Sequence, residues 1–172
     1  MANDNPMRKL RIEKVTVNIG VGEAGENLEK ARKLVEKLTG KTPTLTIARK
    51  RQQTFGIRKG DNIGVKVTIR GDDAEAFLKR ALEAKDMKIS KRAFDKFGNF
   101  SFGLKEYLDF PGVRYDPSIG LIGFDVCVTL KRAGFRIADR KRKKSKLPIK
   151  QRGTMDEALQ FVKEKFKIEI VE

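Results

Sequence analysis

Three segments of the chain alternate between apolar and polar residues, and this pattern constrains the fold more than any other feature. The segments are EKVTVNIG (13–20), IGVKVTIR (63–70) and GFDVCVTLK (123–131). Alternation with a period of two is typical of a β-strand that buries one face. Strands inside a parallel sheet are apolar on both faces, so half-polar strands favour an antiparallel sheet. PTLTIA (43–48) predicts a further short strand, with Pro43 at its first position.

Helical patterns lie between these strands. Apolar stripes predict one helix over 27–39 and another over 72–82. A capping box, Thr154-x-x-Glu157, opens a third helix, and the C-terminal KIEIV predicts a last strand. Helices interleaved with half-polar strands predict an α+β fold, a mainly antiparallel sheet with helices packed on one face and the other face open.

The length of 172 residues predicts a single domain. Within it we expect an N-terminal strand–helix–strand part with a basic loop (9–62) and a C-terminal α+β part (63–168). Residues 1–8 are expected to form a flexible tail. Residues 90–120 are rich in Phe, Gly and Pro and predict no clear order of elements.

The charge balance points to a polyanionic partner. Lys and Arg total 39 residues against 23 Asp and Glu, which gives a formal net charge of +16. Like charges repel one another in a compact chain, and nucleic acid is the commonest partner that neutralises them. An anionic membrane surface is the alternative. The chain has no run of about 18 apolar residues and no apolar segment near its start, so we expect neither a membrane span nor a secretory signal.

Residue usage narrows the possible chemistry. The chain has no histidine, which excludes Ser-His-Asp and Cys-His catalysis and His-ligated metal sites. An enzyme would have to use carboxylates, lysines or a cofactor. The single cysteine, Cys127, cannot form an internal disulfide and is typical of a reducing environment. Nothing near it in the sequence indicates activation, so we interpret it as unreactive.

Gly20, Gly22 and Gly25 have the G-x-G-x-x-G spacing of dinucleotide-binding proteins, within VNIGVGEAGEN (17–27). The strand before them is polar at every second position, whereas the first strand of a dinucleotide-binding fold is buried on both faces. Carboxylates in the same loop would repel a pyrophosphate from the helix N-terminus. We therefore favour glycines that allow a sharp turn. An NADP site is the alternative, because Arg49 could bind a 2′-phosphate.

Two of the alternating strands carry the same polar pattern. If both lie in one sheet, their polar side chains share its open face. There, cations can neutralise phosphates, and Thr or Asn can hydrogen-bond phosphate, ribose or base edges. A merely solvated sheet face is the alternative. The candidate residues are Lys14, Thr16, Asn18, Lys66, Thr68 and Arg70.

The segment RKRQQTFGIRKGD (49–61) has no periodicity and predicts a long exposed loop. Its cations could follow a phosphate backbone while Phe55 contacts a base or a sugar. A mobile surface loop with Phe55 buried in the body of the protein is the alternative. The candidate residues are Arg51, Gln52, Gln53, Thr54, Phe55, Gly56, Arg58 and Lys59.

The densest basic run is RKRKKSKLPIKQR (140–152). Charge repulsion is expected to keep it extended until a polyanion binds. A nuclear-import signal is the alternative. The candidate RNA-binding residues are Arg140, Lys141, Arg142, Lys143, Lys144 and Lys146.

Four phenylalanines, Phe94, Phe97, Phe100 and Phe102, could form a platform on which bases stack. Phe100 and Phe102 fall on one face of a possible strand. Packing in the core is therefore the favoured interpretation.

Taken together, these residues resemble the family of large-subunit ribosomal protein five, which binds 5S ribosomal RNA. The resemblance runs from about Arg11 to Phe166. The basic insert at 131–152 and the short N-terminus resemble the archaeal and eukaryotic branch. The most specific blocks are EKVTVNIGVGEA (13–24), LTGKTPTLTIARK (38–50), FGIRKGDNIGVKVTIRG (55–71), FGNFSFGLKEYLDFPGVRYD (97–116) and GFDVCVT (123–129).

The resemblance implies an α+β fold whose open sheet face and nearby loops bind 5S rRNA in the central protuberance of the large subunit. Asn18 and Thr68 match family positions at that RNA, with Lys14 and Lys66 beside them. Gly40-Lys41-Thr42-Pro43 stands where bacterial relatives have Gly-Gln-Lys-Pro, which makes Lys41 a further candidate contact.

The resemblance also implies further partners. The loop 51–60 matches the loop that reaches toward the P-site transfer RNA, and FPGVRYDPSIG (110–120) matches a region that faces a small-subunit head protein in an intersubunit bridge. Large-subunit rRNA and other 5S-associated ribosomal proteins complete the expected partners, and no membrane is among them.

The sequence therefore predicts a structural, non-enzymatic RNA-binding protein of the cytoplasmic ribosome, without cofactor or metal. Two alternatives stay open. An NADP-dependent oxidoreductase rests on the glycine motif, and a free RNA chaperone would bind many RNAs alike.

Overall fold

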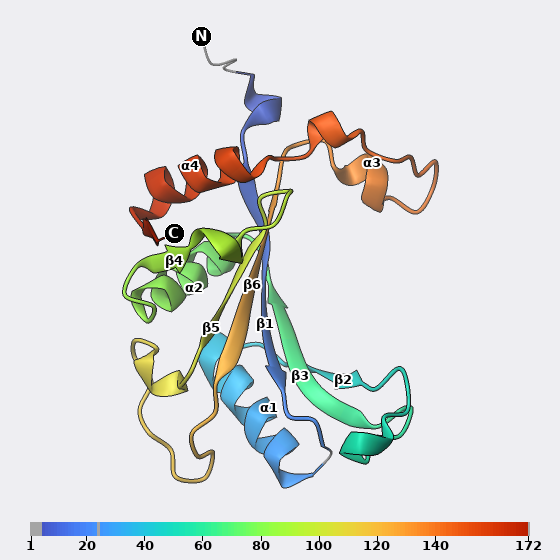
Figure 1. Ribbon diagram of the computed structural model, residues 1–172, viewed down its shortest axis with the longest axis vertical. Helices are drawn as coiled ribbons and strands as arrows, with labels where there is room; N and C mark the ends of the chain where they lie inside the picture. The colour runs from blue at the N-terminus through green and yellow to red at the C-terminus, as the bar shows by residue number, and fades with distance from the viewer. Residues whose placement is uncertain (1–4, 24, 172) are drawn as a thin grey trace.

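The computed structural model describes residues 5–23 and 25–171 (Figure 1). Five strands form one sheet in the order β2-β3-β1-β6-β5, and every neighbouring pair is antiparallel. This arrangement confirms the predicted α+β fold with a mainly antiparallel sheet. The strands are β1 Arg11–Gly20, β2 Thr44–Ile47, β3 Asn62–Ile69, β5 Phe100–Leu104 and β6 Phe124–Lys131.

The first strand of the chain, β1, lies at the centre of the sheet between β3 and β6. Its inward side chains Val15, Val17 and Ile19 are buried. Val17 lies opposite Val67 on one side and Val126 on the other, and both are buried as well. The apolar positions of the three alternating segments therefore build one continuous core, as predicted.

Two helices, α1 Glu26–Thr39 and α2 Asp72–Glu83, pack on this buried face of the sheet, α1 against β3 and α2 against β1. Their apolar stripes join the same core as the strands. Helix α1 ends at Thr39, as predicted, and the next residue, Gly40, has a left-handed φ of 65°. Glycine adopts this conformation without strain, so it ends the helix cleanly.

The C-terminal elements also follow the sequence prediction. Helix α4, Met155–Phe166, starts with the expected capping box. The Thr154 Oγ1 accepts from the Glu157 N–H at 3.4 Å, and Glu157 Oε2 accepts from the Thr154 N–H at 3.0 Å. The predicted last strand is β7, Glu169–Val171, which pairs in parallel with β4, Lys88–Ser90, in a separate two-stranded sheet.

Most of the phenylalanine-rich segment packs into the core. Phe94, Phe100 and Phe102 are buried, and the ring centroids of Phe94 and Phe100 lie 4.9 Å apart. Phe97 is partly exposed, and the guanidinium of Arg152 lies 4.7 Å from its ring centroid. Core packing is confirmed for three of the four rings.

Residues 49–61 are exposed, as predicted, except for the half-buried Ile57 and Asp61, but they form a hairpin that extends β2 and β3 rather than an irregular loop. Gln52 and Ile57 exchange two backbone hydrogen bonds, at 2.9 and 3.0 Å. The tip is a 3-10 turn, Gln53–Phe55, followed by Gly56 at a φ of 67°. We call residues 49–61 the basic hairpin. Backbone hydrogen bonds stabilise it. Because these bonds do not depend on the type of side chain, the pattern of apolar residues in the sequence did not predict the hairpin.

The basic insert, residues 131–152, begins at the last residue of β6 and folds back on itself near one end of the sheet (Figure 1). It contains a short helix, α3 Arg136–Asp139, and the Ser145 N–H donates to the Ile137 carbonyl at 3.2 Å. The expectation that charge repulsion keeps the run 140–152 extended is therefore wrong, because this run folds back on α3 and contains a 3-10 helix, Ile149–Gln151. In Figure 1 the insert and the basic hairpin lie at opposite ends of the molecule.

Short 3-10 helices complete the fold. Residues 1–4 of the predicted flexible tail lie outside the described residues, and the next residues form the first of these helices. The 3-10 helices span Pro6–Arg8, Gln53–Phe55, Lys91–Ala93, Tyr107–Asp109 and Ile149–Gln151.

Candidate nucleic-acid interface

The polar side chains of β1 and β3 lie opposite one another on the face that points away from the core. Thr16 pairs with Thr68, and Asn18 pairs with Lys66. Directly opposed residues of antiparallel strands point to the same side of a sheet, so these four side chains are neighbours. Lys14 lies two residues before Thr16 on the same side. The structure thus brings together the candidates that the alternation predicted.

Neighbouring strands extend this surface. On β6, Asp125 lies opposite Asn18 and Cys127 opposite Thr16, while Ser101 of β5 lies beside Cys127. We call the whole surface the open face; it comprises Lys14, Thr16, Asn18, Thr44, Lys66, Thr68, Ser101, Asp125, Cys127 and Thr129.

The open face is accessible. Its side chains on β3 and β5 are exposed, and those on β1 are half-buried because β1 is the central strand. Helices α1 and α2 pack on the opposite side of the sheet. Among the described residues, no carboxylate forms an ion pair with Lys14 or Lys66. Both cations are therefore available to an external anion.

A β-bulge modifies one end of the open face. The register between β1 and β6 shifts there, so Glu13 and Lys14 together oppose Thr129. Glu13 Oε1 accepts from Lys131 Nζ at 2.7 Å and from Arg70 Nη1 at 3.5 Å. Part of the charge of Arg70 is therefore compensated within the protein, unlike that of Lys14.

Lys41 lies apart from the other candidates, in the turn between α1 and β2. Its Nζ is 2.8 Å from Asp73 Oδ2 at the start of α2, a helix on the buried face. The hydrogen bond from Lys41, and then its charge, lower the pKa of Asp73. The structure does not bring Lys41 onto the open face.

The thiol of Cys127 lies on the open face. Partial burial, and then the negative charge of Asp125, raise the pKa of Cys127. A raised pKa keeps the group protonated at neutral pH, which agrees with the interpretation of Cys127 as unreactive.

The glycine motif forms a turn and not a phosphate site. Strand β1 is antiparallel to both neighbours, whereas a dinucleotide-binding fold places its first strand in a parallel sheet. The N–H groups of Val21 and Gly22 both donate to the Ile63 carbonyl, at 3.0 and 2.9 Å, so neither is free for a pyrophosphate. Gly22 and Gly25 have φ values of 86° and 144°, which glycine favours.

The basic hairpin displays its predicted candidates at its surface. Residues 51–56 and 58–59 are all exposed. Phe55 is 71% exposed, so the alternative in which it is buried is wrong. Within residues 5–23 and 25–171, no cation of this hairpin forms an ion pair with a carboxylate. An aromatic ring and several free cations thus share one protruding tip.

The second basic segment, residues 140–146, is exposed along its whole length. Arg140 Nε donates to the Lys143 carbonyl at 2.8 Å, and Lys143 has a φ of 50°. These two features form a tight turn within the segment. The segment lies near the bulged end of the sheet, far from the basic hairpin (Figure 1).

The segment 110–120 is held against the body of the protein. Asp116 Oδ2 lies 3.2 Å from Lys37 Nζ of α1, and the Asp116 N–H donates to the hydroxyl of buried Tyr107 at 3.0 Å. Hydrogen bonds from Ser118, and then from Lys37, lower the pKa of Asp116. These contacts leave Tyr115 exposed at the surface.

Two kinds of site are absent from the described residues: a membrane-spanning helix and a cluster of metal-binding side chains. None of the helices in the part of the chain that the structure describes has the length and apolar character needed to cross a bilayer. The same residues contain no group of three or more Cys, Asp or Glu side chains placed to hold a metal ion.

Family comparisons match almost the whole chain. The family described as "Ribosomal protein L5" matches residues 5–58, and the model of the C-terminus of the same ribosomal family matches residues 62–162. The chain belongs to the ribosomal protein L5 family. A "Large ribosomal subunit protein uL5" from Sulfurisphaera tokodaii is 54% identical over 169 residues, which cover 98% of this chain and 96% of the relative.

Other relatives agree with this assignment. The L5-family proteins of Sulfolobus acidocaldarius and Methanococcus maripaludis, both named "Large ribosomal subunit protein uL5", are 50% and 49% identical to the chain. The matches cover 98% and 96% of this chain and 95% and 93% of the relatives. These archaeal relatives confirm the resemblance to the archaeal-type branch. Because the L5 family consists of structural, non-enzymatic ribosomal proteins, the oxidoreductase alternative is wrong.

Sequence reasoning missed part of the open face. Thr44, Ser101, Asp125 and Thr129 were not among the candidates, although the structure places them beside Lys66, Cys127, Asn18 and Lys14. The alternation in residues 123–131 already contained the signal for β6, because the positions between its buried residues must point to the open side.

Proposed function

We propose that this L5-family chain is a structural component of the large ribosomal subunit, in the cytoplasmic ribosome, and that its open face binds 5S rRNA. The register of β1 and β3 carries the proposal. It sets hydroxyl, amide and ammonium groups of Thr16, Thr68, Asn18 and Lys66 side by side on a surface that neither α1 nor α2 covers. The relatives' name, "Large ribosomal subunit protein uL5", supports the subunit.

Each group on the open face suits a different part of an RNA strand. The ammonium groups of Lys14 and Lys66 neutralise phosphates and release counterions. Thr16 and Thr68 offer hydroxyls to phosphate or ribose. Asp125 lies opposite Asn18 and repels phosphates, so this pair suits a ribose hydroxyl or a base amino group. Because the face is a preformed sheet, its backbone loses little freedom on binding.

The other basic segments would serve separate contacts. The basic hairpin would reach the P-site transfer RNA, with Phe55 against a base or sugar. Residues 140–146, at the other end of the molecule, would bind rRNA phosphates. The segment 110–120 would face a small-subunit head protein and contribute to an intersubunit bridge.

Binding to 5S rRNA tests the proposal directly. The full chain is titrated with 5S rRNA and with an unrelated structured RNA of similar length, at two salt concentrations. We expect a preference for 5S rRNA that persists at the higher salt, because base and ribose contacts are screened less than phosphate contacts. Equal affinity for both RNAs would favour the free RNA chaperone and overturn the proposal.

A further inference from the structure

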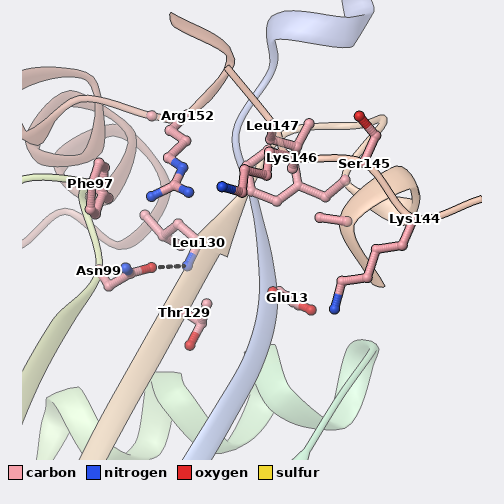
Figure 2. A pocket seen from close by; sticks show the side chains of 13 residues that line it. Glu13, Phe97, Asn99, Thr129, Leu130, Lys144, Ser145, Lys146, Leu147 and Arg152 are labelled. Atoms are coloured by element: carbon pink, nitrogen blue, oxygen red, sulfur yellow. Dashed lines mark hydrogen bonds between the residues drawn. The ribbon is translucent and has the colours of Figure 1, made fainter. Parts of the chain in front are cut away.

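A pocket of about 740 Å³ lies between the bulged end of the sheet and the insert (Figure 2). One wall is formed by Thr129 and Leu130 of β6, and Ala138 of α3 belongs to the wall contributed by the insert. The volume is within the range of pockets that bind small ligands, so it accommodates a single nucleotide. Asn99 holds the wall in place, because its Oδ1 accepts from the Leu130 N–H at 3.1 Å.

The pocket is electropositive. Lys144, Lys146 and Arg152 line it, and none of them forms an ion pair with a carboxylate of the described residues. Glu13 is its acidic lining residue, but Glu13 Oε1 already accepts from Lys131 at 2.7 Å. The excess of positive charge therefore suits a ligand that carries a phosphate.

Arg152 provides a flat surface inside this pocket. Its guanidinium lies 4.7 Å from the ring centroid of Phe97, and Figure 2 shows it on the side of that ring that faces Lys146. Phe97 therefore supports one side of the guanidinium, while Arg152 itself lines the pocket. Guanidinium planes are surfaces on which unpaired RNA bases stack.

We propose that this pocket binds one unstacked nucleotide of 5S rRNA, with its base against Arg152 and Leu130 and its phosphates beside Lys144 and Lys146. The inference rests on the proposed function of the open face. Thr129 belongs to both surfaces, and it lies about 7 Å along β6 from Cys127. An RNA strand that follows the open face as far as Thr129 therefore reaches a residue that lines the pocket.

Filling the pocket without changing charge tests this inference. Ala138→Trp places a large ring in the wall, and Ile137→Trp places the same ring on the same short helix at an exposed residue that does not line the pocket. We expect Ala138→Trp to weaken 5S rRNA binding at least about fivefold, since stacking of one base contributes that much. Ile137→Trp should stay within about twofold of the wild type.

Chemical probing of the bound RNA identifies the nucleotide. In the wild-type complex, one unpaired nucleotide of 5S rRNA should be protected at its base, and this protection should be lost with Ala138→Trp alone. Equal affinity and equal protection for the two tryptophan variants would overturn the pocket. If the wild type shows no preference for 5S rRNA, the proposed function fails first and the pocket proposal fails with it.

A second pair of variants covers the case in which the tryptophan disturbs folding. Arg152→Met and Lys150→Met each remove one positive charge from the same segment, but only Arg152 lines the pocket. We expect Arg152→Met to weaken binding at least about fivefold more than Lys150→Met at the same salt concentration. Equal losses would show that the charges act only at long range, which overturns the pocket while leaving the open face in place.

Discussion

Arg132 Nη2 lies 2.5 Å from both carboxylate oxygens of Glu157, a contact that joins the start of the insert to the start of α4. The Arg132 side chain is 7% exposed. Glu157 also accepts from the Thr154 N–H in the capping box. One carboxylate therefore neutralises a buried cation and caps a helix, which fixes the base of the basic insert.

Removing this carboxylate should destabilise the protein. Glu157→Ala leaves the buried guanidinium of Arg132 without its counterion, and we expect a loss of about 3 kcal/mol in the free energy of unfolding, measured with urea. Glu164→Ala, on the same helix and exposed, should change it by less than about 0.5 kcal/mol. Equal stability of the two variants would show that the ion pair contributes nothing.

Two substitutions on the open face test the RNA contact. Asn18→Ala and Thr68→Ala should each weaken 5S rRNA binding about fivefold in a gel-shift titration, because each removes a hydrogen bond of about 1 kcal/mol. Their unfolding midpoints should stay at the wild-type value, since neither side chain belongs to the core. Asn27→Ala, on an exposed position of α1, is the matched control and should bind normally. Unchanged affinity in both face variants would remove this surface from the binding site.

Cys127 reports on the occupancy of the open face. Its raised pKa means a smaller thiolate fraction at pH 7 than in an unfolded chain, so alkylation by a maleimide should be slower and should accelerate as pH rises. Bound 5S rRNA should slow it further, at least about tenfold, by covering the thiol. As a control, Lys79→Cys in a Cys127→Ser background places the thiol at an exposed position of α2. This thiol should react equally fast with and without RNA. RNA-independent alkylation of Cys127 would place the RNA elsewhere.

A shortened hairpin separates the two RNA contacts. Replacing residues 53–56 by Asn-Gly keeps the Gln52–Ile57 pair and closes it with a two-residue turn. The variant should bind 5S rRNA normally, because the basic hairpin lies at the end of β2 and β3 away from the insert. Reconstituted ribosomes carrying it should bind P-site transfer RNA more weakly. Loss of 5S rRNA binding would contradict this division.

The basic segment 140–146 should contribute to the salt dependence of RNA binding. Reversing the charges of several residues in the segment 140–146 should make the slope of log K against log salt shallower by roughly one for each phosphate that the variant no longer neutralises. The measurement is a set of 5S rRNA titrations at different salt concentrations. A slope equal to that of the wild type would mean that this run binds no phosphate.

The sequence predicted the parts of the fold that depend on local patterns. Alternation at Val15, Val17 and Ile19 identified a strand and its buried side, because a period of two is set by the strand itself. Likewise the capping box at Thr154 and Glu157 marked the start of α4, since all of its groups lie within one helical turn.

Features that join distant segments were not predictable in this way. The position of β1 between β3 and β6, the bulge at Glu13 and the parallel pairing of β4 with β7 all depend on residues far apart in the chain. Lys41 was grouped with the RNA contacts because its sequence context gives no sign of Asp73, 32 positions later, which binds it. The candidate site was therefore predicted as a set of strands, and only the register showed which side chains are neighbours.

The central position of β1 has a consequence for synthesis of the chain. The strand is made first, but its second partner, β6, belongs to the last third of the sequence. Until β6 leaves the translating ribosome, one edge of β1 exposes unpaired backbone groups to neighbouring nascent chains. Pairing of β6 with β1 covers these backbone groups. This pairing, more than the formation of any helix, therefore protects the newly synthesised chain from aggregation.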